Sequence, residues 1–173
     1  EFVNPAILSL VRETLDACGR RIEIEIAIGV EVFDERLRNK AYHKGLSNSN
    51  LEKAVASIVE AGVHLRCYFM YRPLPEMTQE AATADIRLAA DFLDQFVDSA
   101  GSSQITMHLN PTYVAVGTDL EKAFLEGKYH PVQLAEVETL LATLAGHGIN
   151  IYVGLNDEGL AVPGGSFLTP GSE

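Results

Sequence analysis

The chain has 173 residues, 47% of them hydrophobic and 21% charged, which is typical of one folded globular domain. Acidic residues outnumber basic residues by 24 to 13, giving a formal net charge of −11. This charge argues against a nucleic-acid interface built mainly from this chain, because phosphate contacts need clustered Lys and Arg. The sequence contains no apolar run long enough to span a membrane, and we expect a cytoplasmic protein without a signal peptide or membrane contact.

The two cysteines lie far apart in unlike surroundings. Cys18 ends a helical pattern and Cys67 sits within an apolar strand pattern. This usage predicts two free thiols in a reducing compartment. No Cys/His spacing is typical of a zinc or cluster site, so the chain by itself predicts no metal site.

Helical and strand patterns alternate along the chain. Asn4 before Pro5 predicts the start of a first helix, and Gly19 predicts its end. The alternation implies βαβ crossovers and a parallel sheet. The predicted helices are Asn4–Cys18, Leu51–Ala61, Gln79–Ser99, Thr118–Glu126 and Val132–Ala145. The predicted strands are Arg21–Val32, Val63–Tyr71, Gln104–Leu109 and Ile149–Val153, with Asp34–Tyr42 a short, partly helical loop.

Each predicted strand has one apolar face and one polar face. In the second strand, for example, Leu65, Cys67 and Phe69 alternate with Arg66 and Tyr68. Buried parallel strands usually read as near-continuous apolar runs, so helices should cover only one face here. We expect an α/β fold, a partial (βα) TIM-type barrel of about four parallel strands with helices outside and a polar lumen. The alternative is a one-sided α/β layer whose polar face meets solvent.

Several polar residues of these faces are candidate binding residues. Glu25 and Arg66 come from neighbouring strands and are predicted to pair. Glu31, Arg72 and Asn110 lie at carboxyl ends of strands, where α/β sheets bind ligands. The predicted substrate-facing or lumen-lining residues are Glu25, Arg66, Tyr68, Arg72, His108 and Asn110.

Short motifs occur in a recognisable order along residues 20–135. They include the run Glu25–Glu31, Phe33-Asp34-Glu35, His43-Lys44-Gly45, Pro73-Leu74-Pro75 and Asn110-Pro111. In order and spacing they resemble the later part of the barrel of radical S-adenosylmethionine (radical SAM) enzymes, in particular the elongator-like branch.

The resemblance implies that residues 1–155 are the C-terminal half of a radical SAM barrel and that residues 156–173 are a loop and tail. Glu31, Lys44 and Gly29 would then bind S-adenosylmethionine. The family's C-x-x-x-C-x-x-C motif is absent, so the ligands of the 4Fe–4S cluster are expected upstream of Glu1. The full-length protein would generate a deoxyadenosyl radical, with a tRNA base as substrate.

Two other functions stay open at this stage. A metal-dependent (βα) barrel lyase or hydrolase would use Glu31, His108 and Glu25 as ligands. The other is a binding or scaffolding domain without catalysis.

The first predicted strand would also present an unpaired edge. This edge predicts a homodimer of the chain in which the partner covers it.

Overall fold

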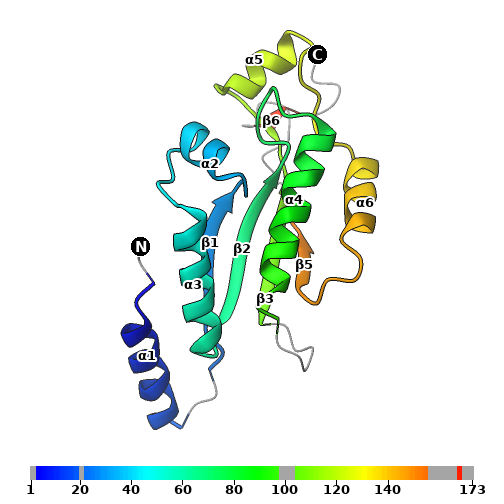
Figure 1. The fold of residues 1–173 in the computed structure, drawn as a ribbon. Coiled ribbons are helices and arrows are strands. Elements are labelled where there is room, and N and C mark those ends of the chain that lie inside the picture. Colours follow the sequence, from blue (N-terminus) through cyan, green and yellow to red (C-terminus); the bar gives the residue numbers. More distant parts are fainter. Residues whose placement is uncertain (1–2, 20–21, 98–103, 156–166, 169–173) are drawn as a thin grey trace.

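The computed structural model describes residues 3–19, 22–97, 104–155 and 167–168. Four strands form one sheet in the order β1-β2-β3-β5, and every neighbouring pair is parallel (Figure 1). Neighbouring strands follow one another along the chain, with helices between them, as consecutive strands of a (βα) barrel do. The predicted fold class, α/β with about four parallel strands, is confirmed. The strands are β1 (Glu25–Glu31), β2 (His64–Tyr71), β3 (Ile105–Pro111) and β5 (Asn150–Val153).

The helices begin at polar caps. Side chains of Asn4, Asp34, Ser47, Thr78 and Thr118 each accept a hydrogen bond from a backbone N–H of the helix that they precede. These caps satisfy donors that have no partner within the helix. The helices of the described residues are α1 (Pro5–Ala17), α2 (Glu35–Ala41), α3 (Asn48–Glu60), α4 (Gln79–Asp94), α5 (Asp119–Leu125) and α6 (Leu134–Thr143).

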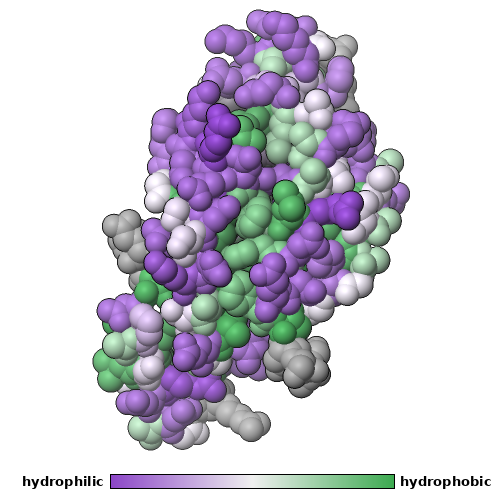
Figure 2. Space-filling view, in the orientation of Figure 1, coloured by the Kyte–Doolittle hydropathy of each residue, from purple (hydrophilic) through white to green (hydrophobic). Residues whose placement is uncertain are grey.

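The core lies between one face of the sheet and the helices. Along β2 and β3 buried residues alternate strictly with half-buried ones. Figure 1 shows α3 and α4 lying across the covered face. Figure 2 views that side, where apolar side chains gather between these two helices. Burial of the alternate apolar residues therefore supplies most of the hydrophobic stabilisation. The buried strand residues are Leu65, Cys67, Phe69 and Tyr71 from β2 and Ile105, Met107 and Leu109 from β3.

Beyond the carboxyl ends of the strands lie α2, α5 and a second, two-stranded sheet (Figure 1). Its strands, β4 (Val114–Ala115) and β6 (Phe167–Leu168), are antiparallel. The tail predicted as loop over 156–173 thus contains a strand at its described residues. The pairing was missed because a two-residue strand has no periodicity to read. Residues 156–166 and 169–173 of that prediction lie outside the described residues.

The first strand is shorter than predicted. β1 begins at Glu25 rather than Arg21, which lies outside the described residues, and Glu25 pairs with His64 at the start of β2. A strand is defined by its neighbour's hydrogen bonds, so β1 cannot be assigned before β2 begins. The segment Asp34–Tyr42, predicted as a partly helical loop, contains the helix α2.

One edge of β1 has no neighbouring strand in the described part of the chain. A cavity of about 510 Å³ lies along it between α1, β1 and α3. Its lining is mainly apolar and includes Ile7, Leu8, Ile26, Ile28 and Leu51. Among the described residues, no helix is both long and apolar enough to cross a membrane.

The two faces of β2 should respond differently to truncation. Phe69→Ala should lower the free energy of unfolding by about 3–5 kcal/mol, because it opens a cavity beneath α3 and α4. Tyr68→Ala, one residue away on the other face, should cost about 1 kcal/mol through lost ring contacts. Urea denaturation of both variants measures the difference. Equal costs would contradict the one-sided core.

Candidate functional site

A row of side chains crosses the sheet on the face that the helices leave uncovered. Strand register places Gly29, Tyr68, His108 and Tyr152 beside one another, one from each strand. The His108 ring lies 4.5 Å from each tyrosine ring, centroid to centroid. The Tyr152 side of this row is open, since that residue keeps 52% of its surface exposed. The row is therefore an aromatic surface with one accessible end.

A polar network borders this row. Arg66 donates from Nε and Nη2 to the two carboxylate oxygens of Glu25, at 2.7 and 3.0 Å. This is the pairing that the sequence predicted. Arg66 Nη1 also lies 3.4 Å from His108 Nδ1, and the guanidinium carbon lies 5.9 Å from the centre of the Tyr152 ring. The bidentate pair fixes the guanidinium plane against the rings.

His108 and Asn110 meet at the carboxyl end of β3. Their side chains are hydrogen-bonded. Burial, followed by the nearby Arg66 charge, lowers the pKa of His108 below its usual value, although Asn110 and Glu25 oppose the change. A lowered pKa favours the neutral imidazole of His108 at neutral pH. Four predicted lumen residues, Glu25, Arg66, His108 and Asn110, thus form one connected group, with Tyr68 stacked beside it.

The three residues predicted to bind S-adenosylmethionine also lie together. Lys44 Nζ lies 3.0 Å from Glu31 Oε1, and both groups sit over Gly29. A Cβ atom on Gly29 would lie 2.9 Å from that Glu31 oxygen and 3.3 Å from Lys44 Nζ. Any side chain at position 29 would therefore displace the ion pair. Both side chains are partly accessible, at 34% for Lys44 and 22% for Glu31.

An unusual backbone turns Glu31 toward this position. The pairing of β1 with β2 shifts register between Gly29 and Glu31, and Glu31 has a φ of 66°. A non-glycine residue in the left-handed region is strained, and such strain is concentrated at functional sites. The irregularity brings the Glu31 carboxylate back over Gly29, where a regular strand would carry it further along the sheet.

Arg38 fastens the segment that carries Lys44. Its side chain is fully buried, and its five N–H groups make five hydrogen bonds, four of them to backbone carbonyls. The carbonyls belong to Val32, Phe33 and Leu46, and the fifth acceptor is Asn48 Oδ1. One guanidinium thus joins the end of β1 to the start of α3.

Asp85 of α4 holds the same segment from the other side. Its carboxylate accepts from the backbone N–H groups of Phe33 and Asp34 at 2.8 and 2.7 Å. Burial raises the pKa of Asp85, while these two hydrogen bonds lower it. Together with Arg38, Asp85 satisfies backbone groups that would otherwise be buried without partners.

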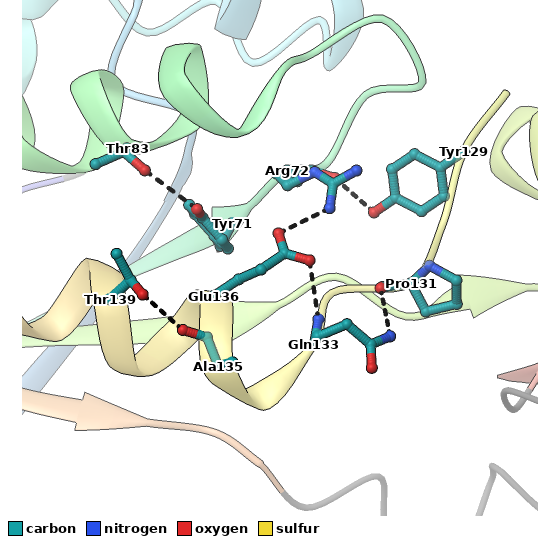
Figure 3. A network of polar contacts seen from close by, with 9 residues as sticks. All are labelled: Tyr71, Arg72, Thr83, Tyr129, Pro131, Gln133, Ala135, Glu136 and Thr139. Carbon is teal, nitrogen blue, oxygen red and sulfur yellow. Dashed lines mark hydrogen bonds and ion pairs between the residues drawn. The ribbon is translucent and has the colours of Figure 1, made fainter.

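Arg72, another predicted lumen residue, lies beside Glu136 and Tyr129 (Figure 3). It directly follows β2 and has a φ of 54°. Its Nη1 donates to Glu136 of α6 at 2.9 Å, and its guanidinium carbon lies 5.2 Å from the centre of the Tyr129 ring. The Tyr129 hydroxyl donates to the Arg72 carbonyl, and burial raises the pKa of this tyrosine to about 12. Arg72 therefore ties the end of β2 to α6.

The metal-dependent alternative finds no support in the arrangement of its proposed ligands. In the described residues no group of three or more His, Cys, Asp or Glu side chains could hold a metal ion. Glu25 is paired with Arg66, Glu31 with Lys44, and His108 lies against a guanidinium. Glu31, His108 and Glu25 therefore do not form the predicted metal site.

Sequence reasoning missed two residues that shape the site, Asp85 and Arg38. Asp85 could have been found, because it shares the apolar face of α4 with Ala82, Ile86 and Ala89. A carboxylate on a buried face needs a partner. Arg38 carries no comparable signal, since Arg36 stands in the same short helix and remains exposed.

No protein-family model matches the chain. Two curated proteins are distantly similar to it. An uncharacterized protein of Methanocaldococcus jannaschii is 27% identical over 141 residues, which cover 82% of this chain and 35% of that protein. Archaeosine synthase subunit beta of Methanosarcina acetivorans is 25% identical over 142 residues, which cover 80% of this chain and 39% of that subunit. The chain thus spans between a third and two fifths of these relatives, one of which is an enzyme subunit.

These comparisons correct the assignment made from the sequence. The prediction of a radical SAM enzyme, with its iron–sulfur radical chemistry, is overturned, because no family model matches and what the comparisons support is distant similarity to these two proteins. The motifs behind that prediction are short and rich in Gly, Pro and charged residues. Such residues end strands and form turns in βα units of many functions, so fold-level likeness alone does not identify a reaction.

Arg38 and Arg36 make a matched pair for testing how the site segment is held. Arg38→Leu should lower the free energy of unfolding by about 3–5 kcal/mol, because buried carbonyls lose their donors. Arg36→Leu, exposed on the same helix, should change it by no more than about 0.5 kcal/mol. Urea denaturation provides the measurement. A small effect of Arg38→Leu would show that the segment does not depend on it.

Proposed function

We propose that this chain is part of an enzyme subunit that modifies a nucleoside in tRNA, as its similarity to archaeosine synthase subunit beta suggests. The observation that carries the proposal is that this similarity extends over 80% of the chain. An alignment of that length must include β2 and β3, two of the strands that build the uncovered polar face, and is not one isolated motif.

The polar face of the sheet would serve as a substrate wall. Its Glu25–Arg66 pair and aromatic row are held by strands, which position side chains more rigidly than loops do. The net charge of −11 disfavours a nucleic-acid backbone interface on this chain. Contacts to tRNA phosphates would then come from other parts of the full-length protein or from a partner subunit.

Self-association of the chain through the open edge of β1 stays a prediction made from the sequence.

We infer that Glu31, Lys44 and Gly29 bind a small zwitterion, with S-adenosylmethionine as the candidate. A ligand that carries both an ammonium and a carboxylate can replace the internal ion pair with two pairs of its own, Lys44 with its carboxylate and Glu31 with its ammonium. The missing side chain at Gly29 leaves room for the charged ends of Glu31 and Lys44 over the strand. The residues present therefore fit the amino-acid end of S-adenosylmethionine.

Loss of the full-length protein should change tRNA. Deleting its gene in the host should remove archaeosine from tRNA nucleoside digests analysed by mass spectrometry. The wild-type gene should restore it, and so should a Glu52→Gln variant altered on the exposed side of α3. Digests whose nucleosides are unchanged after deletion would refute the proposal.

Binding of S-adenosylmethionine should depend on the charge at position 31. Glu31→Gln in the full-length protein should lower the affinity roughly ten- to a hundredfold, because a charge-assisted hydrogen bond to the ligand ammonium is lost. Isothermal titration calorimetry gives the constants, with Glu60→Gln as the control. An unchanged affinity would remove Glu31 from the binding site.

A further inference from the structure

Four side chains of the polar face form a continuous polar chain across three strands. Glu25 stands on β1, Arg66 on β2, and His108 and Asn110 on β3. The carboxylate meets the guanidinium at 2.7 and 3.0 Å, the guanidinium meets the imidazole at 3.4 Å, and the imidazole is hydrogen-bonded to the Asn110 amide. We call these four residues the relay.

The donor and acceptor roles along the relay are set by its arginine. A guanidinium can only donate, so His108 Nδ1, which faces Arg66 Nη1, must accept. A neutral imidazole that accepts at Nδ1 carries its proton at Nε2. His108 Nε2 must then donate to Asn110, which can accept only through Oδ1.

The position of Gly154, which follows β5, agrees with this orientation of the His108 ring and the Asn110 amide. A Cβ atom on Gly154 would contact both Asn110 Oδ1 and His108 Nε2, the latter at 2.9 Å. The two atoms that the relay pairs therefore converge over the same glycine. With Oδ1 turned to the imidazole, the Asn110 amide directs its two N–H donors away from His108.

We propose that the relay orients Asn110 so that its amide donates to an acceptor atom on the base of the substrate nucleoside, while that base stacks on the Tyr152 ring. This inference rests on the proposed function and names the part of the nucleoside that the polar face recognises. Tyr152 is half exposed and lies next to His108 in the aromatic row, and His108 is the residue that pairs with Asn110. Glu25, Arg66 and His108 act as positioning residues.

The charges of the site favour a base over a phosphate as the bound group. Arg66 uses two of its nitrogens on the Glu25 carboxylate and directs the third toward His108. The Glu25 carboxylate would also repel an anion placed beside Arg66. A neutral base gains from stacking and from one directional hydrogen bond, both of which this face offers.

The tautomer of His108 tests the relay without reference to function. Long-range proton–nitrogen correlation spectra of the 15N-labelled chain at neutral pH should show His108 neutral, with its proton on Nε2. In Arg66→Gln this preference should weaken, because a glutamine amide can either donate to or accept from the imidazole. His108 protonated on Nδ1, or charged at neutral pH, would overturn the relay.

Titration with guanosine tests the contact to a base. Ribose, which has no base, is the control. Guanosine should shift the Asn110 side-chain amide and the Tyr152 ring signals, and ribose should shift neither. Asn110→Asp, which removes the donors, and Tyr152→Leu should each weaken guanosine binding about fivefold or more. Asn50→Asp on α3 should leave the affinity unchanged.

The outcomes separate this inference from the proposed function. If deletion of the full-length gene changes tRNA but guanosine leaves Asn110 and Tyr152 unperturbed, the base contact is wrong and the proposed function stands. If guanosine shifts both residues but deletion leaves tRNA unchanged, the base contact stands and the proposed function fails.

Discussion

Burial of only one face of a parallel sheet is the constraint on which the rest of this structure depends. Helices α3 and α4 cover the face that carries Leu65, Phe69, Met107 and their neighbours, and the period of two sends every other side chain to the opposite face. Because strand register aligns the four strands, polar and aromatic side chains from distant parts of the chain meet in one row. The site is therefore a consequence of core formation.

The carboxyl end of the sheet is organised by buried polar groups. Arg38 and Asp85 satisfy backbone carbonyl and N–H groups of the segment between β1 and α3, and that segment carries Lys44 to Glu31. The left-handed backbone at Glu31 is a strained conformation that persists because this surrounding network determines it. The same network therefore holds the Glu31–Lys44 ion pair in one position.

Some features of the uncovered face indicate a functional site more strongly than others. Exposed polar residues on a sheet face are common and indicate little by themselves. A bidentate Glu25–Arg66 pair that continues through His108 to Asn110 is more informative, because every donor and acceptor in it has a determined role. The distant similarity to an enzyme subunit adds a chemical context for such a face. Neither the fold nor this similarity alone would identify the reaction.

The sequence by itself determined the α/β class, the two-faced strands and the pairing of Glu25 with Arg66, because these follow from local periodicity and from neighbouring strand positions. Tertiary structure alone decided which arginine of α2 is buried, since helix propensity does not distinguish Arg38 from Arg36. It also decided that Arg72, which follows β2 with a φ of 54°, pairs with Glu136 of α6. The burial of Arg38 and the contact made by Arg72 depend on packing between distant segments, which no local pattern encodes.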